Sequence, residues 1–209
     1  IEPTSGQVLV DEEDVLAMSD VELKNFRRSK ASMVFQKFAL LPHRTVMENV
    51  GYGLQIQKIP EAEAKTRSQH WIDRVGLTGF EDHYPAQLSG GMQQRVGLAR
   101  ALTTDAEILL MDEAFSALDP LIRTDMQSIL LGLQAELHKT IVFITHDLDE
   151  ALRIGDEITI LRDGEVVQQG TSQQIVMKPA NDYISDFIKD VNRSRVLEVR
   201  SIMVPSKTE

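Results

Sequence analysis

The sequence lacks cysteine, long apolar runs and an excess of basic residues. Because it contains no Cys, it can form neither disulfide bonds nor thiolate metal sites, which suits a reducing compartment. No apolar run approaches the roughly 20 residues that a membrane-spanning helix needs, so we expect neither a membrane span nor a signal peptide. The 22 Lys and Arg residues are outnumbered by 32 Asp and Glu, which gives a net charge of −10 and argues against general affinity for nucleic acid.

The length and composition are those of an ordinary globular protein. With 209 residues, of which 42% are hydrophobic, the chain is long enough for one large domain or for a domain with a subdomain. It begins with Ile1 instead of Met and ends at Glu209. We therefore expect it to be an excerpt from a longer polypeptide.

The most informative apolar stretch runs from Ile108 to Met111 and leads directly into Asp112 and Glu113. Its length and composition predict a strand that is buried on both faces of a parallel sheet. Ligands of such sheets bind beyond the carboxyl ends of the strands, where these two carboxylates lie. One carboxylate can hold a hard cation while the other positions or deprotonates water. The alternative is a polar strand end that simply enters a loop.

Strand and helix patterns alternate along much of the chain. Strands are predicted over the segments 6–11, 31–35, 108–111 and 141–145, with a hairpin of 158–161 and 165–168. Helices are predicted over the segments 20–28, 46–57, 61–75, 92–103, 120–138, 147–155 and 181–190. This alternation is typical of an α/β fold with a largely parallel sheet. Because residues 43–103 contain no good strand, we expect them to form a helical insertion on that sheet.

Polar side chains also follow two other predicted strands. Gln36 comes after the segment 31–35, and His146 comes after the segment 141–145. If these strands lie beside 108–111, an amide, two carboxylates and an imidazole meet at one edge, a set suited to phosphoryl transfer to water. Taken alone, His146 is more often a structural histidine, and the functional case for Gln36 alone is weaker still.

The stretch LSGGMQQR, residues 88–95, is the most specific in the chain. Ser89 can cap a helix, and Gly90 and Gly91 let an anion approach the backbone N–H groups at its start. The helix dipole adds partial positive charge there, which favours phosphate. The alternative is an ordinary Ser-Gly-Gly helix entry.

Taken together, these motifs resemble the ATP-binding subunits of ABC transporters, in which they occur in the same order. They are Gln36, LSGGMQQR, the apolar run into Asp112 and Glu113, Ser116–Asp119 and Ile144–Asp147. The residues between the motifs most closely resemble the glycine betaine/proline (quaternary amine) importer subunits. The resemblance implies a P-loop NTPase-type (RecA-like) fold with a largely parallel sheet and a helical signature-motif subdomain.

The resemblance also implies a division of the chain. Residues 1–42 and 104–180 would form the ATPase core, and residues 43–103 the helical subdomain with the signature motif. Residues 181–209 would form a C-terminal helix and a linker. Within that linker, residues 196–203 resemble the lead-in to a regulatory domain.

The resemblance assigns chemical roles to the polar residues at the strand ends. Asp112 would support Mg²⁺, and Glu113 would polarise the attacking water. His146 would contact the γ-phosphate of ATP. Gln36 would sense the metal and the water and connect them to the membrane subunit.

Further implied roles concern partners. Ser89, Gly90 and Gly91 would grip the γ-phosphate of ATP bound to a second copy of the protein, in a head-to-tail dimer. Asp119 would lie at the dimer interface between the two sites. The surface around residues 38–42 would receive a coupling helix of the permease, unless these residues are only core packing of a loop.

One element of the family pattern is missing. No G-x-x-x-x-G-K-[ST] phosphate loop occurs in the 209 residues, so the implied fold is truncated at its amino-terminal side. Losing three or more charge-assisted hydrogen bonds, each worth roughly 1.5–3 kcal/mol, would cost upward of about 4 kcal/mol of binding energy. We expect this segment alone to bind ATP poorly and not to hydrolyse it, which calorimetry with Mg-ATP would test.

The sequence therefore predicts the ATPase subunit of an importer for glycine betaine, proline or a related compatible solute. It would act at the cytoplasmic face of the membrane with a transmembrane permease, and indirectly with an extracytoplasmic solute-binding protein, but not with nucleic acid. One alternative is a soluble ABC ATPase that works on DNA or ribosomes, although the expected coiled-coil insertion or tandem cassette is absent. The other is a non-catalytic dimerisation or regulatory remnant, which the missing phosphate loop favours and Glu113 and His146 disfavour.

Overall fold

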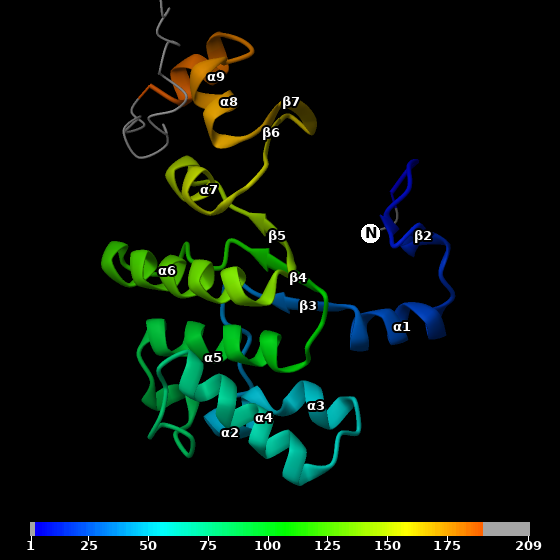
Figure 1. Cartoon of the computed structure of the whole chain (residues 1–209), viewed down its shortest axis with the longest axis vertical. Helices are drawn as coiled ribbons and strands as arrows, with labels where there is room; N and C mark the ends of the chain where they lie inside the picture. Colours follow the sequence, from blue (N-terminus) through cyan, green and yellow to red (C-terminus); the bar gives the residue numbers. More distant parts are fainter. Residues whose placement is uncertain (1–2, 190–209) are drawn as a thin grey trace, which may run out of the picture. The chain divides into compact units, whose positions relative to one another are not determined.

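The first part of the chain contains a three-stranded parallel sheet (Figure 1). The computed structural model describes residues 3–189. Strands β3 (Ala31–Val34), β4 (Ile108–Asp112) and β5 (Thr140–Ile144) pair in parallel in the order β3-β4-β5. The predicted α/β fold with a parallel sheet is therefore confirmed.

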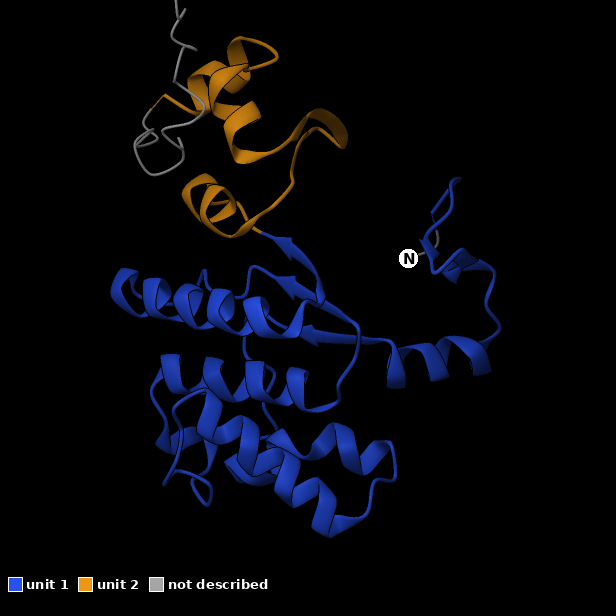
Figure 2. Ribbon diagram, viewed as in Figure 1, with its two compact units in different colours: residues 1–144 blue, residues 145–209 orange. Residues whose placement is uncertain are grey.

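The chain divides into two compact units, residues 1–144 and residues 145–209 (Figure 2). The boundary falls at the end of β5, so the parallel sheet belongs entirely to the first unit. Within the described residues, every helix is too short or too polar to cross a membrane.

Only one face of the parallel sheet is well buried. Leu109 and Met111 of β4 are each 1% exposed, whereas Leu110 between them is 36% exposed. On β5, Val142 is paired with Leu110 and is 48% exposed, and Ile144 on the same face is 58% exposed. The prediction that the strand 108–111, β4, is buried on both faces is therefore wrong, because no described element of this unit fully covers the second face.

The strand predicted over residues 6–11 is shorter in the structure and forms part of a hairpin. Strand β1 (Leu9–Val10) pairs with β2 (Glu13–Asp14) through Asp11 and Glu12, whose φ angles are 51° and 68°. Positive φ at both central residues is the geometry of a type I′ turn, which brings the chain back after two residues.

Helix α1 (Asp20–Ser29) follows a 3-10 helix, Val15–Ala17, and begins at the predicted cap. The Ser19 hydroxyl accepts a hydrogen bond from the Glu22 N–H at 3.4 Å, and the Glu22 carboxylate accepts one from the Ser19 N–H at 2.8 Å. These reciprocal bonds form a capping box. The hydrogen bonds from the side chain and backbone of Ser19 also lower the pKa of the Glu22 carboxyl.

The segment from 43 to 103 is helical, and none of the described strands lies within it. It contains α2 (Val46–Val50), α3 (Tyr52–Ile56), α4 (Glu61–Arg74), a 3-10 helix (Pro85–Gln87) and α5 (Gly90–Thr103). The continuous helix predicted over 46–57 is instead interrupted at Gly51, where a Cβ would lie 3.0 Å from Ser68 Oγ. Apolar residues of this segment form one core cluster: Val46, Val50, Ile72, Val75, Leu77, Leu88, Val96 and Ala99.

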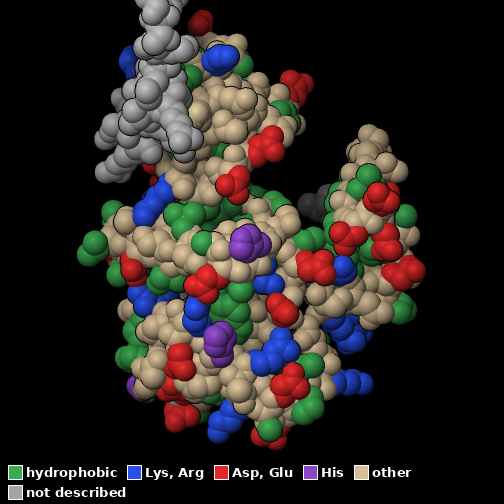
Figure 3. All heavy atoms as spheres, in the orientation of Figure 1, with side chains coloured by type: hydrophobic (Ala, Val, Ile, Leu, Met, Phe, Trp, Pro, Cys, Tyr) green, Lys and Arg blue, Asp and Glu red, His purple; other side chains and the backbone are tan. Residues whose placement is uncertain are grey.

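The last element of the first unit before β5 is α6 (Pro120–Leu137), with the predicted Pro120 in its first turn. On the face of the molecule in Figure 3, acidic, basic and hydrophobic side chains all occur.

The second unit is built around a hairpin. Strands β6 (Ile158–Arg162) and β7 (Glu165–Gly170) are joined through Asp163 and Gly164, at φ angles of 52° and 83°, so the predicted Asp-Gly turn is confirmed. The surrounding helices are α7 (Leu148–Ile154), α8 (Ser172–Met177) and α9 (Asp182–Phe187). The helix predicted over 181–190 thus ends at Phe187. The predicted linker over the last fifteen residues, including 196–203, lies outside the described residues.

Candidate functional site

Gln36 and Glu113 meet at the carboxyl edge of the parallel sheet. Gln36 follows β3 and Glu113 follows β4, and the parallel pairing of these strands brings their ends to the same edge. Gln36 Nε2 donates a hydrogen bond to Glu113 Oε2 at 2.8 Å. Two residues that are 77 positions apart in the sequence are therefore in direct contact, as the strand-end pattern predicted.

The backbone of Glu113 is held in an unusual conformation. Its φ angle is 44°, in the left-handed region that residues with a side chain seldom adopt. Its N–H donates to the carbonyl of Ile144 at the end of β5, at 2.9 Å. Asp112, paired with Ile144 in the sheet, is exposed. A strained residue at the end of a central strand is a recurrent feature of functional sites, because the surrounding structure must impose the conformation.

Ser116 belongs to the same hydrogen-bonded cluster. Gln36 Nε2 lies 3.2 Å from Ser116 Oγ, and Ser116 Oγ donates to the Glu113 carbonyl at 2.9 Å. Ser116 lies in one of the motifs that resemble the family, but the sequence does not predict its contact with Gln36. Its position three residues after Glu113, in the tight turn that ends β4, is the signal that could have found it.

The helix that begins with the signature stretch has the predicted cap. Ser89 Oγ accepts a hydrogen bond from the Met92 N–H at 3.3 Å, and both Ser89 and Gly90 are exposed. Gly91 also allows α5 to pack closely against α6, since a Cβ at this position would lie 2.5 Å from Ile122 Cγ2. The structure thus leaves Ser89 and Gly90 accessible to a ligand and uses Gly91 for close helix packing.

The loop that follows Gln36 is strained and is held by an arginine from α5. Phe38 and Ala39 have φ angles of 54° and 47°, a left-handed conformation that costs roughly 1–2 kcal/mol per residue. Arg100 Nη1 donates to the Ala39 carbonyl at 2.7 Å, and Nη2 donates to the Phe38 carbonyl at 3.1 Å. Burial lowers the pKa of the Arg100 guanidinium, which nevertheless stays protonated.

Asn49 fixes the far end of this loop. Its side chain is 0% exposed, and Oδ1 accepts from the Leu41 N–H at 2.8 Å. Nδ2 lies within hydrogen-bond distance of the carbonyls of Leu41, Arg44 and Thr45, at 3.1, 3.0 and 2.9 Å. The sequence does not predict the roles of Asn49 and Arg100, because their side chains bind backbone groups that only the folded loop brings close to them.

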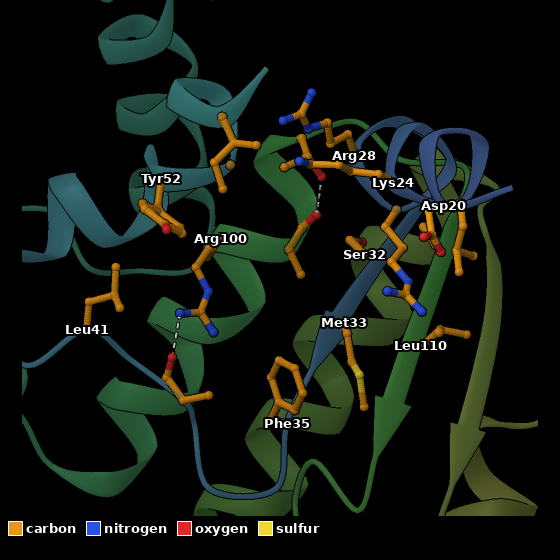
Figure 4. A pocket seen from close by; sticks show the side chains of 18 residues that line it. Asp20, Lys24, Arg28, Ser32, Met33, Phe35, Leu41, Tyr52, Arg100 and Leu110 are labelled. Carbon is orange, nitrogen blue, oxygen red and sulfur yellow. Dashed lines mark hydrogen bonds between the residues drawn. The ribbon is translucent and has the colours of Figure 1, made fainter. Parts of the chain in front are cut away.

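A cavity of about 880 Å³ lies beside this loop in the first unit (Figure 4). Apolar side chains form much of its lining, among them Leu23, Met33, Phe35, Leu41, Tyr52, Ile56 and Leu110. Helix α1 adds Lys24, Arg27 and Arg28, and Asp20 is the one carboxylate among the described residues that line it. The cavity therefore combines an apolar floor with a rim of positive charge.

Asp119 has a structural role that its place in the motif did not reveal. It is the N-cap of α6, and its Oδ1 accepts from the N–H groups of Leu121 and Ile122, both at 3.2 Å. Its carboxylate is therefore engaged within its own chain.

His146 is the third residue expected at the edge of the sheet, and it lies in the second unit. It follows β5 by two residues and stands between two hydrogen-bonding neighbours. Thr145 Oγ1 donates to Glu150 Oε2 at 2.6 Å and accepts from the Asp147 N–H at 3.0 Å, and Asp147 caps α7. The structure thus brings Gln36 and Glu113 together in the first unit, and the meeting of His146 with them stays a prediction.

The residues at the sheet edge fit a magnesium–phosphate ligand better than a metal held by protein alone. No group of three or more His, Cys, Asp or Glu side chains suited to a metal occurs among residues 3–189. Mg²⁺ commonly takes only one or two carboxylates and completes its shell with water and phosphate oxygens. The exposed carboxylate of Asp112 next to Glu113 meets that requirement.

Comparison with known sequences identifies close relatives. Residues 1–116 match the ABC transporter family. The glycine betaine transport ATP-binding protein OpuAA of Bacillus subtilis is 57% identical over 208 residues, which cover 100% of this chain and 50% of OpuAA. The glycine betaine/proline betaine transport system ATP-binding protein ProV of Escherichia coli is 54% identical over 202 residues, covering 97% of this chain and 50% of ProV. The chain spans about half the length of these curated relatives.

Solved structures show the same architecture. The ATP-binding cassette MJ0796, described as dimeric and in a post-hydrolysis state bound to ADP and Pi, is 36% identical with a TM-score of 0.73. That similarity covers 82% of this chain and 75% of the MJ0796 chain. The protein cbiO1 of Clostridium perfringens, part of the ABC transporter complex cbiONQ, is 27% identical with a TM-score of 0.77, over 93% of this chain and 76% of cbiO1.

Proposed function

Because the chain belongs to the ABC transporter family, we propose that it acts as the ATP-binding and ATP-hydrolysing subunit of an importer for glycine betaine, proline or a related compatible solute. The observation that carries the proposal is the 2.8 Å hydrogen bond between Gln36 and Glu113 at the carboxyl edge of the sheet. The solute class is taken from relatives at 54% and 57% identity that are named as glycine betaine transport proteins.

In this proposal the two neighbouring carboxylates do different work. Asp112 supports Mg²⁺, which supplies charge neutralisation for the phosphate groups of ATP. Glu113 accepts a hydrogen bond from the attacking water and orients it. Gln36 holds the Glu113 carboxylate, and His146 hydrogen-bonds a phosphate oxygen. Since the sequence contains no phosphate-loop motif, we propose that residues 1–209 alone do not hydrolyse ATP.

A second copy of the protein is the proposed partner at the signature stretch. Ser89 and Gly90 are exposed at the start of α5, where backbone N–H groups and the helix dipole favour an anion. We propose that Ser89, Gly90 and Gly91 contact the γ-phosphate of ATP on the second copy, in a head-to-tail dimer, with Asp119 at the interface. The similar cassette MJ0796 is described as dimeric, which supports this arrangement.

The proposed membrane partner is a permease, which we place at the cavity beside the loop 36–41. The apolar floor suits the apolar face of a short helix, and Lys24, Arg27 and Arg28 suit acidic groups along its side (Figure 4). Gln36, at the start of this loop, would connect the docked helix to Glu113. The subunit would then work at the cytoplasmic face of the membrane, with an extracytoplasmic solute-binding protein as an indirect partner.

The proposal is tested with Glu113→Gln in the full-length protein. This variant keeps the size of the side chain but removes its basicity, so we expect ATP binding to persist and turnover to fall about 10²- to 10⁴-fold. Glu107→Gln is the matched control, because Glu107 precedes the opposite end of the same strand and pairs only with Lys30 in the described structure. Unchanged turnover in Glu113→Gln, or an equal loss in both variants, would refute the assignment.

A further inference from the structure

Thr145 and Glu150 form a hydrogen-bonded pair inside the second unit. The Thr145 hydroxyl donates to Glu150 Oε2 at 2.6 Å, which is in the range of short bonds from a hydroxyl to a carboxylate. Glu150 lies on α7 and is only 4% exposed. Because Glu side chains are seldom buried to this extent, a carboxylate at this position calls for an explanation.

The pair encloses His146, whose two neighbours in the chain are both tied to α7. The Thr145 oxygen that donates to Glu150 also accepts from the Asp147 N–H at 3.0 Å. Asp147 Oδ1 in turn accepts from the Glu150 N–H at 3.2 Å. These bonds close a ring through residues 145, 147 and 150. The backbone is therefore held on each side of His146, while His146 itself is exposed.

Helix capping alone does not account for the buried carboxylate. Asp147 is already the N-cap of α7, through its bond with the Glu150 N–H. The bond from the Asp147 N–H uses the Thr145 hydroxyl only as an acceptor. An apolar side chain can often fill a buried position of this kind at little or no cost in stability. The bond from Thr145 to Glu150 thus adds a constraint on the turn that the helix does not need.

The apolar core of the second unit fixes the helix that carries this constraint. Leu152 of α7 is buried in that core, and Leu148 and Ala151 pack against it. Because the core holds α7 in place, a bond to Glu150 fixes its partner relative to the same core. The turn that contains His146 is therefore anchored, although His146 makes up its exposed part.

We propose that Thr145 and Glu150 are positioning residues for His146 in ATP hydrolysis. Their hydrogen bond holds the backbone of the turn, so the exposed imidazole keeps the direction in which it can hydrogen-bond a phosphate oxygen. Without the Thr145 hydroxyl, the turn samples more conformations and the imidazole spends less time in that direction. The inference rests on the proposed function, because it takes His146 as the residue that contacts phosphate.

The first test is Thr145→Val in the full-length protein. Val has the same branched shape as Thr but no hydroxyl, so neither of the two bonds of Thr145 Oγ1 can form. We expect kcat for Mg-ATP hydrolysis to fall about tenfold and KM to change by less than about twofold. Thr145→Ser restores the hydroxyl and should return kcat to within about threefold of the wild type. An unchanged kcat in Thr145→Val, or an equal loss in Thr145→Ser, would overturn the inference.

Thr171→Val is the matched control in the same unit. Thr171 caps α8, where its Oγ1 accepts from the Gln174 N–H at 3.3 Å, so this variant also loses a threonine hydroxyl at the start of a helix. We expect it to lower the Tm and to leave kcat unchanged. An equal loss of kcat in Thr145→Val and Thr171→Val would show that the loss of a hydroxyl anywhere in this unit lowers turnover, which would also overturn the inference.

A double-mutant cycle separates positioning from general damage. If Thr145 acts through His146, Thr145→Val should lower kcat about tenfold when His146 is present and by less than about twofold in the His146→Ala background. The same tenfold loss in both backgrounds would show that Thr145 acts independently of His146, against the proposal. Thr145→Ala, which also lacks the hydroxyl and is smaller, takes the place of Thr145→Val in every test if the valine variant does not fold.

A spectroscopic readout does not depend on hydrolysis. In the full-length protein with ¹³C-labelled histidine, the imidazole Cε1–H signal of His146 is identified by its absence from His146→Ala. This signal should be the same in the wild type and Thr145→Ser, and broadened or shifted in Thr145→Val. An unchanged signal in Thr145→Val would contradict the positioning role. A wild-type protein that does not hydrolyse ATP would instead refute the proposed function, and the signal would still decide whether Thr145 orients His146.

Discussion

Replacing Asn49 should be one of the most destabilising single changes in the first unit. Asn49→Leu keeps the approximate shape of the side chain and removes its hydrogen-bonding groups. The partly buried amide of Leu41 then loses its acceptor, and the carbonyls of Leu41, Arg44 and Thr45 each lose a donor. The change therefore tests whether buried polar contacts, and not apolar packing alone, hold the loop 36–41 in place.

The magnitude follows from these contacts. A typical hydrogen bond contributes about 1 kcal/mol net, and a buried group left without a partner costs about 1–3 kcal/mol. The Leu41 N–H at 2.8 Å and the Arg44 carbonyl at 3.0 Å, both partly buried, would lose these partners, whereas the carbonyls of Leu41 and Thr45 still accept from the backbone N–H groups of Arg44 and Asn49. We expect the free energy of unfolding to fall by about 2–5 kcal/mol, a large part of the roughly 5–15 kcal/mol that stabilises a typical domain.

Urea denaturation followed by circular dichroism measures this loss, and amide hydrogen exchange at Leu41 reports it locally. Asn49→Asp is a useful second variant, because its carboxylate can still accept from Leu41 but cannot donate to the carbonyls. Asn25→Leu, at an exposed position of α1, is the control and should change the unfolding free energy by less than about 0.5 kcal/mol. If the free energy of unfolding of Asn49→Leu differs from that of the wild type by less than about 0.5 kcal/mol, the contacts of Asn49 do not hold the loop in place.

Two further predictions concern the helical segment. Hydrogen bonds from Thr78 and Gln69 lower the pKa of Asp73, so their stabilising effect is present at neutral pH and is lost as the pH falls below about 4. Thr78→Val should therefore lower the Tm at pH 7 but flatten its decline on acidification, and parallel curves of Tm against pH would contradict this. Gly91→Ala should lower the free energy of unfolding by about 1–3 kcal/mol, because the new Cβ would lie 2.5 Å from Ile122 Cγ2. Gly132→Ala on α6 should instead raise it by about 0.5–1 kcal/mol, because a Cβ at Gly132 has no neighbour within 4 Å. Equal effects of the two alanines in urea denaturation would contradict the packing argument.

The elements that the sequence predicted best are those defined by local chemistry. The Ser19–Glu22 capping box, Pro120 at the start of α6 and the Asp163-Gly164 turn involve residues close together in the chain, and all three are in the structure. The prediction failed where distant contacts decide. Gly51 interrupts the helix over 46–57 where the chain passes close to Ser68, and an apolar run cannot show which face of a strand another element covers.

The same division holds at the candidate site. Gln36 and Glu113 could be paired from sequence, because the ends of parallel strands share one edge. Arg100 and Asn49 could not, since their partners are backbone carbonyls and amides whose direction depends on the loop conformation. The left-handed angles of Phe38, Ala39 and Glu113 were equally hidden, because none of these residue types signals a positive φ.

The position of β5 has a consequence for how the protein behaves in solution. Among the described strands of its sheet it has one neighbour, β4, and the side chains of Val142 and Ile144 on it are exposed. Such an edge can accept an extended segment of another molecule by strand addition. The edge of β5 is therefore one place where strand addition can begin, and a charged residue in place of Val142 or Ile144 should weaken it.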